Sequence, residues 1–371
     1  FLPTVQHKFL LLLASIALSL SIAVSAHAAT YFVSVNGGSD SNPGTETAPF
    51  KTIAHGSQEM SGGDTLYIRA GTYEESMMHG FYGFEFKNGK AGAMTRFLAY
   101  PGEEALAHGY TKSDNGKVIV KSPARGDGKP HATLWYSVNT QYIEIRGLVI
   151  DGINAGGVKF DHSYKNNIAA KNNLLINNEI RYGGGIGGGG GNEIIGNWIH
   201  HSRVYGLYTG FDNGLFDGNL VEDCYGYGLH LFQQDHEVNG WVVRNNIFRR
   251  NGGNYRPTTK GRDGSLRPLP GVILTRGSNQ FYNNLVYDNP YGGITVGLQA
   301  KDTLVANNIV YRNGEHGIRI NLSFGGSLNT RVINNIVWDN NGEAIINLGT
   351  NTKLQNNLTT DPKVVNAAGG D

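Results

Sequence analysis

Short apolar runs alternate with single asparagines or glycines along most of the chain. A typical unit runs from Thr330 to Val337, where a β-prone run meets Asn335 and a second apolar run follows. Apolar residues at every second position are typical of short strands with one buried face. The triplet of a turn residue and two mostly apolar residues begins in its earliest form at Gly147 and recurs at Asn178, Asn197, Asn219, Asn246, Asn284, Asn308, Asn335 and Asn357.

Successive markers lie between 19 and 38 residues apart, around a base spacing near 22 that insertions lengthen. Such a period indicates a solenoid, in which each unit stacks only on its neighbours. After each marker come a second short strand, a glycine and a third strand, as in Gly317 to Ile320. Three parallel strands per coil predict an all-β fold, a right-handed parallel β-helix. We expect the marker asparagines to adopt left-handed backbone angles and to hydrogen-bond along the solenoid as a ladder.

The first residues have the pattern of a cleavable signal peptide over 1–28. Lys8 supplies a positive charge, an apolar run covers 9–24, and small residues stand at Ala26 and Ala28. No later stretch is long and apolar enough to span a bilayer. We therefore expect an exported protein, secreted or periplasmic, with no membrane partner.

The remaining residues, 29–371, are expected to form one domain. Strands are predicted near 31–35 and 64–70, and a short helix near 50–60 is expected to cap the open end of the core. Irregular coil insertions are predicted at 79–131 and 251–270. The start at Phe1 and the abrupt end at Asp371 predict that the C-terminus is truncated.

Composition narrows the classes of partner. The net charge is +1, so the protein has no strong overall positive electrostatic field that would attract nucleic acid. Cys224 is the single cysteine of the chain, which excludes an internal disulfide. The 53 glycines are consistent with many tight turns between short strands. We expect a monomer.

Several segments resemble the opening and closing stretches of secreted bacterial β-helix proteins, namely residues 31–34, 38–45, 48–53, 63–73, 99–103 and 361–365. The chain is thereby similar to the pectate-lyase-like superfamily, which includes polysaccharide lyases, uronan epimerases, glycoside hydrolases and phage tailspikes. The resemblance implies an acidic, uronate-containing polysaccharide as partner, with alginate as the first choice and pectate as the second. It specifies the chemistry less well than the fold.

The resemblance also implies that the substrate groove follows the first strand of each coil. If the apolar residues that follow each glycine point inward, the residues after them point outward. These outward residues are Lys159, Gly187, Tyr208, His230, Ile273, Thr295 and Arg319. Tyr208 and His230 are then expected on neighbouring rungs that face solvent. Gly187 leaves space for a sugar ring between Lys159 and Tyr208.

A β-elimination on a uronate needs a group that neutralises the carboxylate, a base and an acid. Histidine and tyrosine can serve as base and acid, and lysine or arginine can bind the carboxylate. We therefore predict Tyr208 and His230 as the acid–base pair, and Lys159 as the neutralising cation or an alternative base. Residues predicted to bind the substrate are Arg203, Tyr205, Gln233, Arg262, Arg276 and Arg319.

Simpler interpretations stand beside this one. The aromatic and histidine side chains can merely stack on a sugar, and outward cations are usually only solvated. The insertion at 251–270 carries Arg256, Lys260, Arg262 and Arg267 against Asp263, and it is either a basic wall over the groove or an ordinary exposed loop.

Other chemistries have less support. Asp212 and Asp235 are the best pair of carboxylates for a glycoside hydrolase, but the paired-Asp and Gly-His-Gly motifs of β-helix polygalacturonases are absent. A uronan C5-epimerase is the nearest rival, although Tyr205-Gly206 is not followed by the Asp-Pro-His-Asp segment of that group. The sequence indicates no metal or cofactor. It contains no dense acidic cluster of the kind that binds Ca²⁺, although it does not exclude a calcium ion. A non-catalytic carbohydrate-binding solenoid is the alternative outside the enzymes.

Overall fold

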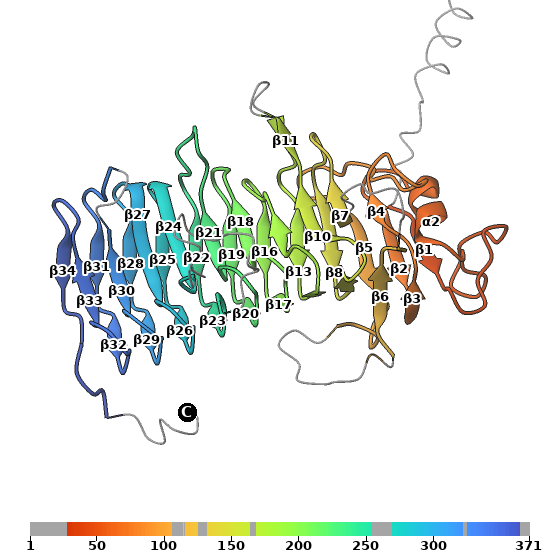
Figure 1. Cartoon of the computed structure of the whole chain (residues 1–371). Helices are drawn as coiled ribbons and strands as arrows, with labels where there is room; N and C mark the ends of the chain where they lie inside the picture. Colours follow the sequence, from red (N-terminus) through yellow and green to blue (C-terminus); the bar gives the residue numbers. More distant parts are fainter. Residues whose placement is uncertain are drawn as a thin grey trace, which may run out of the picture.

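The computed structural model describes residues 28–105, 114, 116–124, 132–163, 168–253, 269–321 and 325–363. In this part of the chain, short strands stack into three long parallel sheets around one core and form an elongated solenoid (Figure 1). The predicted all-β, right-handed parallel β-helix is confirmed. The predicted signal peptide lies outside the described residues except for Ala28. No helix within the described ranges is both long and apolar enough to cross a membrane.

Sheet A contains the strand that precedes the asparagine turn of each coil. Its strands, in order along the solenoid, are β1 (Thr30–Val33), β2 (Thr65–Ile68), β5 (Thr95–Ala99), β8 (Ile143–Arg146), β13 (Leu174–Ile176), β16 (Glu193–Ile195), β19 (Leu215–Asp217), β22 (Val242–Arg244), β25 (Gln280–Tyr282), β28 (Leu304–Ala306), β31 (Arg331–Ile333) and β34 (Lys353–Gln355).

Sheet B contains the strand that follows the asparagine turn. Its strands are β3 (Gly71–Tyr73), β6 (Val118–Lys121), β9 (Val149–Asp151), β14 (Glu179–Arg181), β17 (Trp198–His200), β20 (Leu220–Glu222), β23 (Ile247–Arg249), β26 (Leu285–Tyr287), β29 (Ile309–Tyr311) and β32 (Ile336–Trp338).

Sheet C completes each coil and contains the predicted groove strands. Its strands are β4 (Met77–Met78), β7 (Ala132–Tyr136), β10 (Gly156–Phe160), β15 (Ile186–Gly187), β18 (Leu207–Thr209), β21 (Leu229–Leu231), β24 (Val272–Gly277), β27 (Ile294–Ala300), β30 (Ile318–Ile320) and β33 (Ile345–Asn347). A small antiparallel pair, β11 (His162–Ser163) and β12 (Ile168–Ala169), projects beyond β10 (Figure 1).

The asparagine ladder between sheets A and B is confirmed. The Oδ1 atom of Asn197 accepts the backbone N–H of Asn178 at 3.0 Å, and Asn178 Nδ2 donates to the carbonyl of Ile145 at 3.0 Å. The same link repeats from coil to coil as far as Asn357, with every ladder side chain buried except this last one. Each amide thereby satisfies polar backbone groups that the bend would leave unpaired inside the solenoid.

The expectation about backbone angles was wrong by one residue. The left-handed conformation falls on the residue before each ladder asparagine, for example Asn177 with φ 53° and Asn245 with φ 56°. The earliest coil shows the same offset, because Val149 pairs with Glu179, which puts Leu148 rather than Gly147 opposite the ladder. The preceding residue makes the bend, which leaves the ladder asparagine free to turn its side chain inward.

Apolar side chains fill the interior. Phe216, Phe248 and Phe281 are fully buried, and their rings follow one another with centroids 6.1 and 5.9 Å apart. The N-terminal end is closed by α2 (Ile53–Glu59), which starts where the side chain of Thr52 accepts the N–H of His55. The predicted capping helix is therefore present, and Ile53 joins the core.

The expectation of an irregular insertion at 79–131 was wrong for two of its segments. β5 pairs with β2 and β8 in sheet A, and β6 pairs with β3 and β9 in sheet B. Both are ordinary coil strands. The repeat pattern does not reveal them, because no ladder asparagine joins these two strands in the described part of the chain. Most of the predicted insertion at 251–270, namely residues 254–268, lies outside the described ranges. The predicted substrate-binding residue Arg262 is one of these residues.

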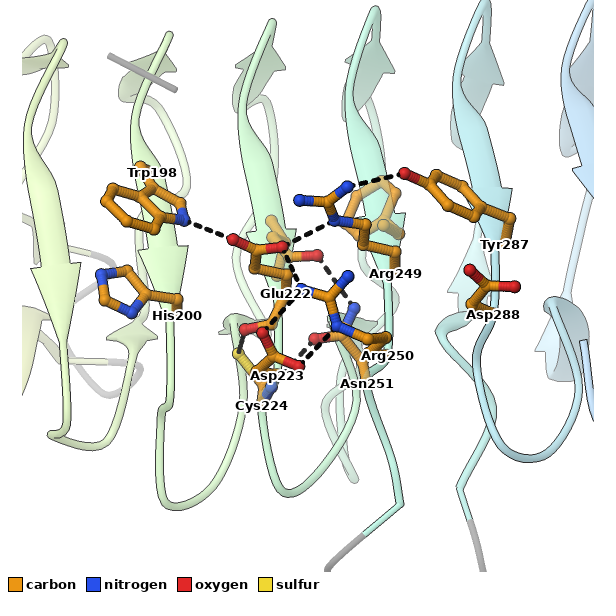
Figure 2. A network of polar contacts seen from close by, with 12 residues as sticks. Trp198, His200, Glu222, Asp223, Cys224, Arg249, Arg250, Asn251, Tyr287 and Asp288 are labelled. Carbon is orange, nitrogen blue, oxygen red and sulfur yellow. Dashed lines mark hydrogen bonds and ion pairs between the residues drawn. The ribbon is translucent and has the colours of Figure 1, made fainter. Parts of the chain in front are cut away.

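Charged side chains are buried on the outer face of sheet B. Glu179 is only 3% exposed, and its carboxylate pairs with Lys117 Nζ at 3.2 Å and Arg181 Nη1 at 3.0 Å. Two coils further on, Glu222 accepts from Trp198 Nε1 at 2.8 Å and from Arg249 at 2.6 Å (Figure 2). These charges are paired, as buried charges must be.

The network predicts acid-sensitive stability centred on Glu179. Burial raises the pKa of this carboxyl, but the hydrogen bond to His200 and the charges of Lys117 and Arg181 outweigh it and lower the pKa to about 2. An unfolded glutamate has a pKa of about 4.3, so this stabilisation is complete above about pH 4.3 and is lost as the pH falls toward 2. Urea unfolding between pH 5 and 2 measures it.

Glu179→Gln should remove this part of the pH dependence. At neutral pH it should cost about 3–5 kcal/mol, because the buried ammonium of Lys117 loses its partner. Glu193→Gln, at an exposed site on sheet A, is the matched control and should cost about 0.5 kcal/mol or less. Equal costs for the two variants would contradict the role given to Glu179.

Candidate active site

The predicted column of outward residues runs along sheet C in the expected register. Lys159 pairs with Gly187, Gly187 with Tyr208, and Tyr208 with His230. The column continues through Ile273, Thr295 and Arg319 on the following rungs. Tyr208 and His230 are therefore direct neighbours, and their rings meet edge to face with centroids 5.0 Å apart.

His230 is more enclosed than the sequence predicts. Its side chain points out of the sheet, yet the residue is only 8% exposed. The ring of Tyr227 lies 4.6 Å away, Phe232 stacks at 5.2 Å, and Ile273 occupies the next rung. Both ring nitrogens are buried, and neither has a hydrogen-bond partner among the residues that the structure describes. A buried polar group without partners is rare and calls for a functional explanation.

Burial sets the protonation of this pair. It lowers the pKa of His230 to about 3, so the imidazole is neutral at physiological pH. Burial also raises the pKa of the half-buried Tyr208, so its phenol keeps its proton. The site thus holds a neutral imidazole, with one nitrogen able to accept a proton, beside a phenol able to donate one.

A second tyrosine side chain extends the cluster. Tyr205 stacks on Tyr208 at 4.9 Å and on Tyr227 at 5.9 Å. Tyr205 was predicted from the sequence to bind substrate, whereas Tyr227 and Phe232 were missed. A signal for Tyr227 exists, because Tyr-Gly-Leu occurs at 205–207 and again at 227–229, two aligned positions.

The space over Gly187 is open. A Cβ atom added there would meet nothing closer than the Val158 carbonyl oxygen at 4.0 Å. On its far side, the Lys159 ammonium lies 4.3 Å from the centre of the Trp135 ring and 3.4 Å from Asp161 Oδ1. Lys159 is thus two rungs, or about 10 Å, from Tyr208.

The predicted arginines fall at different distances from this pair. The Arg276 guanidinium lies 5.6 Å from the ring centre of Phe232, which itself stacks on His230. Its Nε is buried without a hydrogen-bond partner among the described residues. Arg319 is three rungs beyond His230, and Arg203 donates to the backbone carbonyl of Ile153 at 2.8 Å. Arg276 is therefore the predicted cation that is linked to the pair through one ring.

A pocket of about 690 Å³ lies beyond the ends of the sheet C strands. Asp212, Asp235 and Gln233 all line it, together with His236. The Asp212 carboxylate accepts the N–H of Asn239 at 2.8 Å and lies 3.4 Å from His236 Nε2. The two predicted carboxylates thus share one pocket next to the column but do not stand on it. His236 was not predicted.

Within the described ranges, no group of three or more His, Cys, Asp or Glu side chains is arranged to hold a metal ion. Cys224 is free and buried, and burial raises the pKa of its thiol to about 12. The sequence indicates no cofactor but leaves calcium open, and chelation tests this point.

Comparisons with known proteins agree with the architecture. The chain is 24% identical over 358 residues to the uncharacterized protein YwoF of Bacillus subtilis (strain 168), covering 80% of this chain and 70% of that protein. Among solved structures, ORF18 of Geobacillus virus E2 matches with a TM-score of 0.56 at 14% identity, over 95% of this chain and 64% of the other. The A-module of the mannuronan C-5 epimerase AlgE4 of Azotobacter vinelandii matches with a TM-score of 0.51 at 16% identity, over 88% and 95%.

The structural likenesses concern the fold. The family described as right handed beta helix region matches residues 131–265 and 258–370, which is more than half of the chain. The protein therefore belongs to the right-handed β-helix family.

Proposed function

We propose that this protein cleaves an acidic, uronate-containing polysaccharide by β-elimination, with alginate as the first choice and pectate as the second. The observation that carries the proposal is the buried, neutral imidazole of His230, which has no hydrogen-bond partner among the described residues and packs against the phenol of Tyr208 on the outer face of sheet C. The mannuronan epimerase module shares this fold and acts on a uronan, which supports the class of substrate.

The protonation states of the two side chains support one division of roles. His230 accepts the C5 proton of the uronate, and the electron pair of that C–H bond forms the C4=C5 double bond. The C4–O4 bond breaks, and the departing oxygen takes the proton of Tyr208. The reverse assignment would need an imidazolium and a phenolate, and burial disfavours both.

Arg276 is the proposed partner of the sugar carboxylate. Its Nε has no partner in the described part of the chain, and its guanidinium is separated from His230 by the ring of Phe232. A guanidinium that pairs with the carboxylate neutralises the negative charge of the carboxylate, which makes the neighbouring C5 proton more acidic. Arg203 is a less suitable partner for the sugar carboxylate, because its guanidinium already donates a hydrogen bond to the Ile153 carbonyl.

The geometry also supports alginate over pectate. Tyr208 and His230 project from neighbouring strands on the outer face of sheet C, so both would reach the sugar from the same side. In a mannuronate unit, the C5 proton and O4 lie on the same side of the ring, which suits such a pair. In a galacturonate unit they lie on opposite sides. We further propose an exported monomer without nucleic-acid or membrane partners.

The first test follows the ultraviolet absorbance of the 4,5-unsaturated uronate when the purified protein meets alginate, pectate and neutral controls. Tyr208→Phe and His230→Ala should each lower kcat by at least about 100-fold, because each removes a proton-transfer group. Both variants should keep the circular dichroism spectrum of the native protein. Full activity in both would overturn the assignment.

The products separate the rival functions. New reducing ends without the absorbance indicate a hydrolase, for which Asp212 and Asp235 are the residues to replace. An altered ratio of mannuronate to guluronate without cleavage indicates a C5-epimerase. Binding without any product indicates a carbohydrate-binding solenoid. Loss of activity in EDTA, with recovery on adding Ca²⁺, would show a calcium requirement.

A second prediction concerns the pH dependence of kcat/KM. Because the pKa of His230 in the free protein is lowered to about 3, the acid limb should fall well below the pKa of about 6.5 of a solvated histidine. The base stays deprotonated and active above about pH 4. A limb centred near 6.5 would contradict the buried state of His230.

A third prediction concerns the open floor at Gly187. Gly187→Ala should change the free energy of unfolding by about 0.5 kcal/mol or less, because its Cβ meets open space. The added methyl group enters the groove beside Tyr208, so KM for the polysaccharide should rise about tenfold. In Gly185→Ala, by contrast, the Cβ would lie 1.8 Å from the Tyr205 carbonyl oxygen, and the protein itself should be destabilised. An unchanged KM in folded Gly187→Ala would show that the sugar chain does not cross this rung.

A further inference from the structure

We propose that Phe81, Trp135 and Lys159 form a distal subsite that binds one uronate unit of the same polysaccharide chain, about three rungs from Tyr208. The inference rests on the proposed function, because its occupant is the acidic chain that the pair at Tyr208 and His230 would cleave. It gives Lys159 a role in binding in place of the catalytic role predicted from the sequence.

An exposed aromatic stack stands on sheet C at the N-terminal end of the column. Phe81 is 48% exposed, and its ring is nearly parallel to that of Trp135, with centroids 5.3 Å apart. A tight turn holds Phe81 there, since the N–H of Phe84 donates to the Phe81 carbonyl at 3.0 Å. The two central residues, Tyr82 and Gly83, both have positive φ, at 54° and 75°, as in the turns of tight hairpins. Tyr82, next to Phe81 on this turn, is 42% exposed, so the two rings form a contiguous exposed aromatic patch, a feature that marks binding surfaces.

A cation adjoins this stack. The Lys159 ammonium lies 4.3 Å from the centre of the Trp135 ring, and the side chain is 46% exposed. Its ion pair with Asp161, at 3.4 Å, is exposed to solvent and therefore weak, so a ligand carboxylate can compete for the ammonium. An aromatic face packs against the C–H face of a pyranose ring, and an ammonium binds a carboxylate. A uronate offers both features on one ring.

The stack is continuous with the candidate active site. Trp135, Lys159, Gly187 and Tyr208 occupy consecutive rungs in register. Three rungs of about 4.8 Å make about 14 Å, and a pyranose unit is similar in length to one rung. A chain of about four units that crosses the open floor at Gly187 therefore reaches from the stack to Tyr208.

The test measures binding by calorimetry in the full-length Tyr208→Phe protein, so that no substrate is consumed. The probes are hexamers of mannuronate and of galacturonate, with cellohexaose as the neutral comparison. For whichever acidic hexamer binds, Phe81→Ala should lower the affinity about tenfold, equivalent to about 1.4 kcal/mol. Lys159→Gln should weaken it similarly and reduce its salt dependence. Tyr311→Ala, which removes an aromatic ring from the outer face of sheet B, is the matched control and should leave the affinity unchanged.

The outcomes separate this inference from the proposed function. Weaker binding in Phe81→Ala supports the subsite even if the native protein shows no elimination. Unchanged affinity in both Phe81→Ala and Lys159→Gln overturns the subsite, while loss of turnover in Tyr208→Phe would still uphold the lyase. An equal loss for cellohexaose overturns the uronate specificity of the subsite. If the protein binds neither acidic hexamer, the subsite and the proposed function fail together.

Discussion

The in-register stacking of coils is the constraint on which the rest of this structure depends. A buried ladder asparagine such as Asn178 accepts the backbone N–H of Leu148 and donates to the carbonyl of Ile145, both on the preceding coil, so neighbouring coils are linked at the bend. A slip of one residue in any strand would turn its apolar residues to solvent and its outward residues into the core. The outward column on sheet C therefore exists as one continuous surface only because the interior is held in register.

The outer faces of sheets B and C use this register in opposite ways. On sheet B, buried charges are paired, at Glu179 with Lys117 and Arg181 and at Glu222 with Arg249, the latter shown in Figure 2. On sheet C, buried side-chain atoms lack hydrogen-bond partners among the described residues, at His230, Arg276 and Arg319. No strand of sheet B in the described ranges carries such an atom. Paired charges stabilise a structure, whereas buried polar atoms without partners cost stability and call for an explanation, which the proposed function supplies as contact with a ligand.

The sequence predicts the fold well, because the fold depends on a repeated local pattern. The same alternation puts Tyr208 beside His230, as observed. It does not predict the enclosure of His230, because that depends on how Tyr227 and Phe232 orient their rings from a turn and from the next outward position. Strand β5 was missed for another reason, since no ladder asparagine follows it.

The pocket shared by Asp212 and Asp235 shows the limit of pattern analysis most clearly. Both residues follow the ends of sheet C strands, where the chain leaves the repeat and the coils differ in length. Which carboxylate meets which histidine there is decided by individual turns, as in the contact of Asp212 with His236. Periodicity places residues on strands but not on the turns between them.

The low pKa of His230 gives the site a dependence on its own substrate. In the described part of the chain, the buried imidazole has no hydrogen-bond partner, and burial lowers its pKa to about 3, so it is a weak base. A bound uronate brings a carboxylate into this enclosed space, and a nearby negative charge raises the pKa of a histidine. Under the proposed function, Arg276 would bind the same carboxylate and oppose that rise. On that proposal, the basicity of His230 would be set by how the carboxylate is shared between these two groups, so a polysaccharide without carboxylates would leave the base inactive.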